Sequence, residues 1–236
     1  MAKGKIRWLG HSFVEFTTAD NKIIYFDPWT KEDGNPATGT TLDEIERADL
    51  VLVSHDHLDH VASAMSICDK TGALLGGAVQ TVARLQAEGL ASERVVNFGA
   101  GYMVGGGVNL DWVTVTAIPA MHSSDTACAL GHIVQAQDGT TLYHAGDTSI
   151  FGDMKLWAES YPLDLACLPI GGVFTMDAGQ ASLAAAMLKP DLVLPIHYAS
   201  FPIVAQSPGE FVDLTAKRAP EVRVLTPEVG EAVVLS

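Results

Sequence analysis

The sequence predicts an α/β protein in which two β-sheets pack face to face and helices cover their outer faces, a four-layer αββα sandwich. Three observations predict this architecture. Strand-like runs lie at the ends of each half of the 236-residue chain, helical stretches lie between them, and the continuous apolar run at 50–53 is suited to burial on both faces of a sheet. Because no flexible linker and no repeat of fixed period is visible, we expect one domain over residues 1–236.

The first half is expected to begin with short strands. The second of these alternates as Phe13-Val14-Glu15-Phe16, which is typical of a half-buried strand. A short helix is expected over 41–48, because several acidic residues lie in its early turns, where the helix dipole favours them. The expected strands are Ile6–Leu9, Phe13–Phe16, Lys22–Phe26, Leu50–Val53, Ala73–Leu75 and Val95–Phe98, and the further helices are Val61–Asp69 and Ala78–Glu88.

The second half repeats this alternation. A glycine turn at 105–107 precedes one long expected strand over 108–118. Asp177 and Gln180 have capping-box spacing for a helix over Ala178–Leu188, which Pro190 ends. The remaining expected strands are Ile133–Ala136, Thr141–His144, Leu165–Pro169, Leu192–Ile196, Val222–Leu225 and Ala232–Leu235.

The composition restricts the possible partners and the compartment. With 28 acidic and 14 basic residues, the formal charge of −14 argues against binding to nucleic acid or to an anionic membrane. The N-terminus does not resemble a signal peptide, and no apolar run is long enough to span a bilayer. Cys68, Cys128 and Cys167 are widely spaced, so we expect buried free thiols in a reducing compartment, the cytoplasm.

The most informative segment is Ser54-His55-Asp56-His57-Leu58-Asp59-His60, which directly follows the apolar run at 50–53. Five ionisable side chains at the mouth of a buried strand are costly to desolvate unless a cation compensates them. Imidazole and carboxylate groups suit zinc and related divalent metals. The alternative is a solvated polar loop that happens to contain several histidines.

The spacing in this segment is compatible with two ions. In an extended chain His55 and His57 point to the same side and can bind one ion. Asp59 and His60 can face a second ion where the chain turns into a helix that begins near Val61.

Three further candidate ligands each follow an apolar run: His122, Asp147 and His197. Alone, these residues would more often be a capping residue, a turn residue and a structural histidine. Together with the first motif they predict a shared metal site at one edge of the sheets.

The pattern His-x-His-x-Asp-His, then a lone His, a Gly-Asp and a final His, resembles the metallo-β-lactamase superfamily over nearly the whole chain. The motifs at 8–12, 27–29, 170–177 and 195–198 are similar to a family of small metal-dependent hydrolases whose distant relatives include ascorbate-6-phosphate lactonase and an N-acyl-phosphatidylethanolamine-hydrolysing phospholipase. The resemblance implies a first metal held by His55, His57 and His122, a second held by Asp59, His60 and His197, and a bridging Asp147. It also implies that Asp27 orients a ligating histidine, and the alternative is that Asp27 forms the turn before Pro28.

The activity that follows is hydrolysis of an ester, lactone, amide or phosphodiester bond of a small molecule by a hydroxide bridging two divalent metals. Zinc is expected, although manganese, iron or nickel would suit the same donors. Asp59 or a metal-bound water would protonate the leaving group. His11 either contacts the substrate or an oxyanion, or is merely a turn histidine. The chain has no Gly-x-Ser-x-Gly elbow that would supply a serine nucleophile.

Several alternatives stay open at this point. A mononuclear iron dioxygenase acting on persulfides would use the same fold, and a non-catalytic metal-binding module would use the same ligands. A nuclease usually carries a basic surface or an inserted domain, for which this acidic chain has no obvious room. Homo-oligomerisation is possible. Four apolar residues near strand ends could line a pocket but more often simply pack in such positions: Trp29, Phe174, Met176 and Tyr198.

Overall fold

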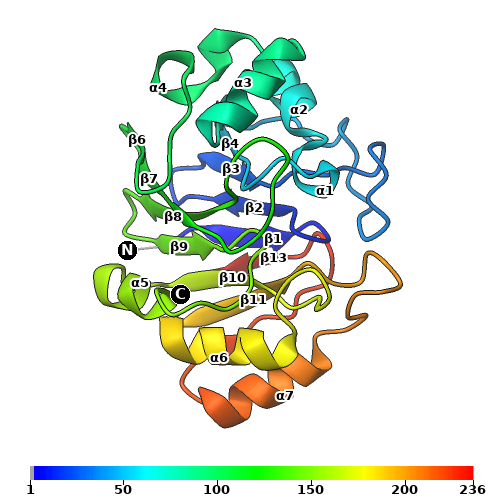
Figure 1. The fold of residues 1–236 in the computed structure, drawn as a ribbon, viewed down its shortest axis with the longest axis vertical. Coiled ribbons are helices and arrows are strands. Elements are labelled where there is room, and N and C mark those ends of the chain that lie inside the picture. Colours follow the sequence, from blue (N-terminus) through cyan, green and yellow to red (C-terminus); the bar gives the residue numbers. More distant parts are fainter. Residues whose placement is uncertain (1–2, 236) are drawn as a thin grey trace.

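The computed structural model describes residues 3–235 and contains two sheets that pack face to face (Figure 1). The first sheet contains, in spatial order, β13 (Ala232–Val234), β1 (Lys5–Trp8), β2 (Val14–Thr17), β3 (Ile23–Phe26), β4 (Leu50–Leu52) and β5 (Leu74–Gly76). The second contains β12 (Arg223–Val224), β11 (Leu192–Ile196), β10 (Leu165–Pro169), β9 (Thr141–His144), β8 (Leu130–Ala136), β7 (Val113–Pro119) and β6 (Gly107–Leu110).

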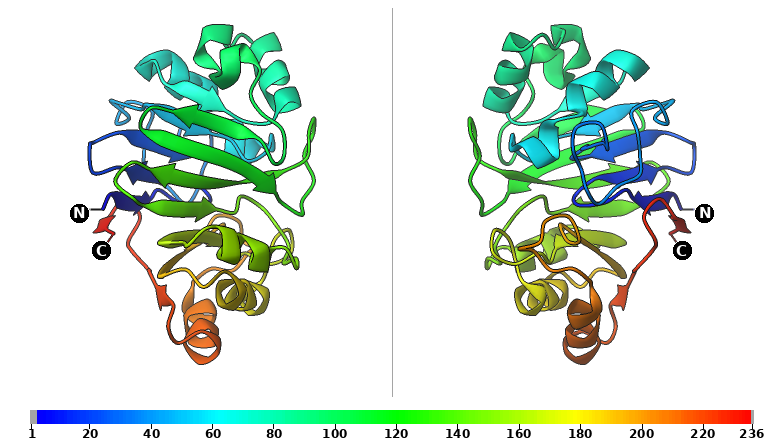
Figure 2. Two further views of the ribbon diagram at one scale, coloured as in Figure 1. Left: turned by 90° about the vertical axis from the view of Figure 1, so that its left-hand side faces the viewer. Right: turned by 90° about the vertical axis from the view of Figure 1, so that its right-hand side faces the viewer.

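The helices lie at the two ends of the molecule, with the sheets between them (Figures 1 and 2). One group contains α1 (Leu58–Val61), α2 (Ala64–Thr71), α3 (Val79–Ala87), the 3₁₀ turn η1 (Ser92–Arg94) and α4 (Val96–Gly99). The other contains α5 (Met154–Ser160), α6 (Ala178–Leu188) and α7 (Gly209–Arg218). The predicted αββα arrangement is therefore confirmed. Within residues 3–235, the helices are too short or too polar to cross a bilayer.

The apolar run at 50–53 shows why the layers form. Leu50 and Leu52 belong to the core between the sheets, whereas Val51 and Val53 pack in a second core beneath α2 and α3. Successive residues of a strand point to opposite faces, so one continuous apolar strand joins both cores. All four side chains are fully buried, as the sequence predicts.

The strand directions bring distant segments to one edge. Strands β3, β4 and β5 are parallel, and so are β9, β10, β11 and β12. Because the carboxyl ends of parallel strands meet at one edge, the segments that follow β3, β4, β9, β10 and β11 gather there. The predicted ligands of 54–60 follow β4, Asp147 follows β9 and His197 follows β11.

Several predicted elements have the predicted bounds. Strands β9, β10 and β11 and helix α6 match residue for residue. The Asp177 carboxylate accepts a hydrogen bond from the Gln180 backbone N–H, which confirms the predicted cap of α6. Most other strand ends differ by only a few residues.

The helix expected over 41–48 is wrong. This segment forms isolated turns, in which the Glu44 carboxylate accepts hydrogen bonds from the backbone N–H and the hydroxyl of Thr41. The ammonium group of Lys70, on α2, donates to the carbonyls of Leu42 and Asp43. Those carbonyls are the acceptors that a helix would need, so tertiary contacts override the local preference.

The strand expected over 95–98 is also wrong, because the chain turns there into α4. Asn97 and Phe98 adopt left-handed backbone angles with φ of 55° and 59°. The Asn97 side chain donates hydrogen bonds to the carbonyls of Gly101 and Gly107, which holds the turn. Asn tolerates this conformation better than most residues.

Two further boundaries are corrected. The long strand expected over 108–118 is a hairpin, in which β6 pairs with β7 and a turn at 111–112 reverses the chain. The helix expected over 61–69 is divided into α1 and α2, so the first turn of helix already contains Asp59 and His60. Helices α5 and α7 were not predicted from the sequence.

The cysteines correct a further expectation. Cys68 and Cys167 are buried and free, as predicted, but Cys128 is exposed. Cys128 lies on the loop between β7 and β8, which runs over the surface.

Candidate metal centre

All seven predicted ligands lie at the edge where the parallel strands end. The structure brings them together in overlapping groups, within which the potential ligand atoms lie within 4.8 Å of one another. The groups are His55, His57 and His122; His11, Asp59, His60 and His197; and His55, His60 and Asp147. Six loops or helix turns, spread from residue 11 to residue 197, supply these side chains.

The first group combines the loop after β4 with the loop after β7. The Nε2 atom of His55 lies 3.0 Å from Nδ1 of His57, and both rings pack edge-on against His122. The other ring nitrogen of His55 bonds to the Ser54 hydroxyl at 2.9 Å, which fixes the orientation of the ring. Three imidazole nitrogens therefore converge on one point.

The second group combines α1 with the loops after β1 and β11. The first turn of α1 carries Asp59 and His60, and His197 directly follows β11. His11 also belongs to this group, since its Nε2 lies 3.0 Å from Oδ2 of Asp59 and its Nδ1 lies 2.7 Å from the Ser200 hydroxyl. The sequence reasoning considered His11 for a substrate contact and did not anticipate its contact with Asp59.

Asp147 lies between the two groups. Its Oδ2 atom is 3.6 Å from Nε2 of His122 and 3.1 Å from Nε2 of His197. Its Oδ1 atom is 3.4 Å from Nε2 of His60. One buried carboxylate thus faces both groups, which is the arrangement that a bridging ligand requires.

Asp27 lies directly behind His60. One carboxylate oxygen of Asp27 accepts a hydrogen bond from Nδ1 of His60 at 2.8 Å. The Asp27 carboxylate also accepts hydrogen bonds of 2.7 Å from the backbone N–H and the hydroxyl of Ser54. Because Nδ1 of His60 is occupied, Nε2 is directed towards Asp147.

The donor atoms fit a cation. Among the described residues, Nε2 of His60 and Oδ1 of Asp147 are buried and have no hydrogen-bond partner. Burial lowers the pKa of His55 to about 3 and that of His11 to about 4, so both rings are neutral at pH 7, and a neutral imidazole such as that of His55 has one nitrogen lone pair to offer. Buried groups with free lone pairs and unpaired carboxylate oxygens are the environment that a divalent metal stabilises.

The electrostatics of the second group favour the same conclusion. Burial disfavours a charged His60, yet the carboxylates of Asp147 and Asp27 raise its pKa well above the usual value. Burial also opposes ionisation of Asp147, but His197 and His60 hold its pKa well below the usual value. Two buried carboxylates therefore require positive charge beside them, which bound cations would supply.

The backbone is strained where it delivers these residues. His11, Asp27, His197 and Ala199 all have positive φ, between 44° and 58°. Such conformations are uncommon for residues other than glycine and gather at functional sites. A Cβ atom at Gly171 would lie 2.3 Å from the His197 carbonyl oxygen, so only glycine fits there.

A further residue, Asp56, anchors the loop that carries His122. Its carboxylate accepts hydrogen bonds from the hydroxyls of Ser124 and Thr126 and from the backbone N–H of Asp125, the last at 2.8 Å. The Arg84 guanidinium lies 3.4 Å from the same carboxylate. The sequence reasoning assigned Asp56 no role, although a carboxylate inside a buried motif signals bonded partners.

The remaining two histidines lie outside these groups. Nε2 of His132 bonds to the buried Tyr102 hydroxyl at 2.8 Å, and Nε2 of His144 bonds to the Ser12 carbonyl at 3.1 Å. Of the four residues expected to pack near strand ends, Trp29, Met176 and Tyr198 are buried. Phe174 is instead 56% exposed, so packing does not account for it.

Comparisons with known proteins identify the family. Residues 22–198 match the family model of the β-lactamase superfamily domain. The chain is 46% identical over 231 residues to a UPF0173 metal-dependent hydrolase of Nitratidesulfovibrio vulgaris strain DP4, an alignment that covers 98% of this chain and 95% of the relative. It is 38% identical to the UPF0173 metal-dependent hydrolase of Caldivirga maquilingensis, with 98% and 97% covered.

A solved structure agrees with these sequence matches. Igni18, a metallo hydrolase from the archaeon Ignicoccus hospitalis, superposes with a TM-score of 0.88 at 34% identity, covering 99% of this chain and 98% of Igni18. With the geometry described above, these similarities show that the chain belongs to the UPF0173 family of metal-dependent hydrolases within the β-lactamase superfamily.

Proposed function

We propose that this hydrolase binds two divalent cations and cleaves an ester, lactone, amide or phosphodiester bond of a small molecule. His55, His57 and His122 would hold one cation, Asp59, His60 and His197 the other, and Asp147 would bridge them. The observation that carries the proposal is the position of Asp147, within 3.1–3.6 Å of a histidine nitrogen of each group. Zinc suits this histidine-rich set, and manganese, iron and nickel compete for the same donors.

Two cations, when bound, lower the pKa of a shared water towards about 7 and polarise the substrate oxygen. The chain's own residues then have distinct tasks. Asp27 fixes the ring of His60, and Ser54 fixes the ring of His55. These contacts hold the ligand atoms in place before substrate arrives, which reduces the reorganisation that the reaction requires.

Asp59 is the candidate proton carrier. Its side chain is 23% exposed, so it connects the buried group with solvent. Asp59 takes the proton that the attacking water releases and delivers it to the leaving group. His11 donates from Nε2 to Asp59 when its Nδ1 accepts from the Ser200 hydroxyl, so His11 orients the carboxylate.

The experiment is metal quantification followed by turnover. Protein purified without added metal is analysed for bound metals, depleted with a chelator, reconstituted, and assayed on a panel of lactones, esters, phosphodiesters and thioesters. We expect two metals per chain and activity that returns only on reconstitution. One iron per chain with oxygen uptake would overturn the proposal in favour of a dioxygenase.

Variants separate the site from the fold. His57→Ala and Asp147→Ala should abolish metal-dependent turnover while circular dichroism shows a folded chain. His132→Gln is the matched control, because His132 bonds to Tyr102 outside the ligand groups. Full activity in either ligand variant would contradict the assignment.

A further inference from the structure

We propose that the substrate carries an uncharged apolar group beside the bond that is cleaved, so that the enzyme prefers neutral carboxylic esters, lactones or amides of apolar acids to phosphodiesters. This inference rests on the proposed function and names its substrate class. It is based on a set of exposed apolar side chains, which we call the apolar rim: Leu58, Met121, Val173, Phe174 and Ile203.

All five rim residues lie on segments at the strand edge where the candidate metal ligands lie, and only Leu58 and Met121 adjoin ligands in sequence. Leu58 lies between two of them in sequence, and Met121 immediately precedes another. Val173 and Phe174 belong to the loop after β10, and Ile203 to the loop after β11. Their exposures range from 56% to 69%, which is costly for large apolar side chains unless something covers them in function.

Hydrogen bonds join the rim loops into one mouth. The backbone N–H of Met121 donates to the Thr148 hydroxyl at 2.9 Å, and the N–H of Met176 donates to the Thr148 carbonyl at 3.0 Å. The loop after β10 is joined in turn to the loop after β11, since the N–H of Ala205 donates to the Gly171 carbonyl at 3.0 Å. Thr148 directly follows Asp147, so these three joined loops adjoin the metal centre.

The tip of the loop after β10 is held in an unfavourable conformation. Val173 has a φ of +58°, which is rare for a β-branched residue. The N–H of Phe174 bonds back to the Gly172 carbonyl at 2.6 Å and tightens the turn. The chain thus holds Val173 and Phe174 exposed at the mouth, and strain of this kind is typical of binding sites.

The scarcity of cationic side chains at the mouth argues against the alternative substrate class. The segments that carry the candidate ligands or the rim, at 54–63, 119–128, 145–152, 170–177 and 197–207, contain neither Lys nor Arg. Phosphate esters are usually recognised through charge-assisted hydrogen bonds from such residues. An apolar mouth without cationic side chains favours an uncharged substrate, whose apolar part covers the rim.

The test is a series of p-nitrophenyl esters from acetate to butyrate to hexanoate, with bis(p-nitrophenyl) phosphate as the charged comparison. Burial of a methylene contributes about 0.8 kcal/mol, or roughly fourfold in affinity. Because the apolar rim covers the acyl chain of the substrate only partly, we expect kcat/KM to rise roughly two- to fourfold per methylene. The phosphodiester should be the poorer substrate.

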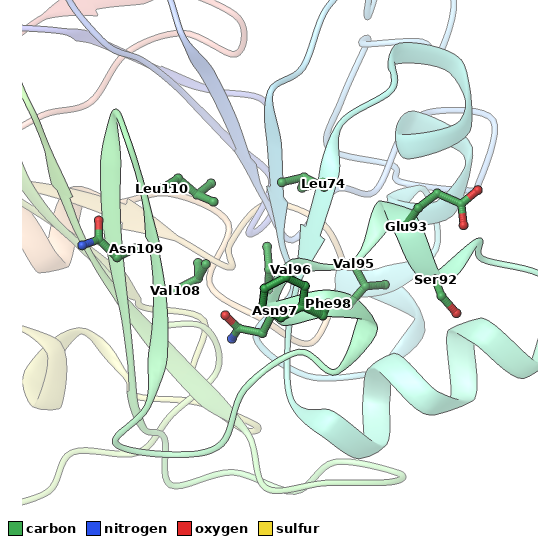
Figure 3. Close-up of a pocket in the computed structure, with 10 residues that line it drawn as sticks. All are labelled: Leu74, Ser92, Glu93, Val95, Val96, Asn97, Phe98, Val108, Asn109 and Leu110. Carbon is green, nitrogen blue, oxygen red and sulfur yellow. The ribbon is translucent and has the colours of Figure 1, made fainter.

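Rim variants identify which residues produce the increase. Phe174→Ser and Ile203→Ser should flatten the chain-length dependence, mainly through KM, and Phe174→Leu should largely restore it. The matched control is Phe98→Ser. Phe98 is fully exposed and lines a pocket between β5 and β6, to which no ligand-bearing loop contributes (Figure 3).

The outcomes are distinguishable. No metal-dependent turnover of any substrate would overturn the proposed function itself. Turnover without chain-length dependence, or a preference for the phosphodiester, would overturn only the present inference. This inference would also be overturned if Phe98→Ser flattened the chain-length dependence as much as the rim variants do. It would be overturned likewise if rim variants converted an oligomer to a monomer and left the dependence intact, because the rim would then bind a second copy.

Discussion

Replacing Asp56 should weaken one of the two candidate metal sites selectively. Asp56 lies between His55 and His57 in sequence, but its carboxylate binds the loop that carries His122. Its side chain is fully buried, and the Arg84 guanidinium bonds to its backbone carbonyl at 3.0 Å. Asp56→Asn removes the charge and two of the acceptor positions with little change in volume.

The magnitude follows from the pKa of Asp56. Burial would raise the pKa, but hydrogen bonds from Ser124, Thr126 and the backbone N–H of Asp125 lower it from 3.8 to about 2. At about 1.4 kcal/mol per unit, the ionised form is stabilised by about 2 kcal/mol in the folded chain. This contribution is fully present above pH 3.8 and is lost as the pH falls through about 2.

Two assays measure the effect. Urea unfolding of the metal-free protein should show Asp56→Asn destabilised by about 2 kcal/mol near pH 7. Competition with a chromophoric chelator should show a loss of about 10- to 100-fold in affinity for the metal bound by His55, His57 and His122. Affinity for the second metal should change much less.

The control is Asp125→Ala. The Asp125 side chain is 66% exposed and lies 3.7 Å from Arg84, so it should contribute little. Unchanged stability and zinc affinity in Asp56→Asn would refute the reasoning. Equal losses of affinity for both metals would show that Asp56 supports the whole site and not the loop of His122.

Three further predictions address other parts of the structure. Asp27→Asn should lower the affinity for the second metal by about 10- to 100-fold, because it disturbs the hydrogen bond that orients His60. The same competition assay measures this affinity, and an unchanged value would contradict the prediction. A thiol reagent should modify one cysteine in the native protein, Cys128, and all three after unfolding; rapid labelling of a second thiol would show that the core opens. Gly171→Ala should reduce metal affinity and stability, whereas Gly152→Ala, where a Cβ meets nothing within 4 Å, should not; equal melting temperatures and affinities would argue against the close approach at 171.

Much of the fold could be predicted because the strongest signals are local. Strands β10 and β11 are apolar runs buried along their whole length, and each begins directly after an aspartate. Strand β9 is also buried throughout and lies just after the turn at 138–139. The cap of α6 depends on two residues three positions apart. Ligands that directly follow such strands could be proposed from sequence for the same reason.

The features that could not be predicted depend on contacts between distant residues. Lys70 takes the carbonyls that a helix over 41–48 would use. His11 meets Asp59 across the edge of the first sheet, and it meets Ser200 only when the two sheets pack. The bonds from Asp56 to the loop at 123–126 likewise join segments about seventy residues apart, for which the sequence has no periodic signal.

The exposure of Phe174 is an exception to a local preference rather than a long-range contact that the sequence cannot show. Aromatic residues near strand ends usually pack, and sequence reasoning follows that preference. Here the loop after β10, which we propose to border the metal centre, leaves Phe174 56% exposed. A local rule therefore fails at a candidate functional site, where such failures are expected.

The central claim is that two cations lie among seven converging side chains. The most direct measurement is anomalous diffraction from crystals of the zinc-loaded protein, collected above and below the zinc absorption edge. The account predicts two peaks about 3.5–4 Å apart, one among His55, His57 and His122 and the other among Asp59, His60 and His197, with Asp147 contacting both. A single peak, or peaks away from these side chains, would contradict it.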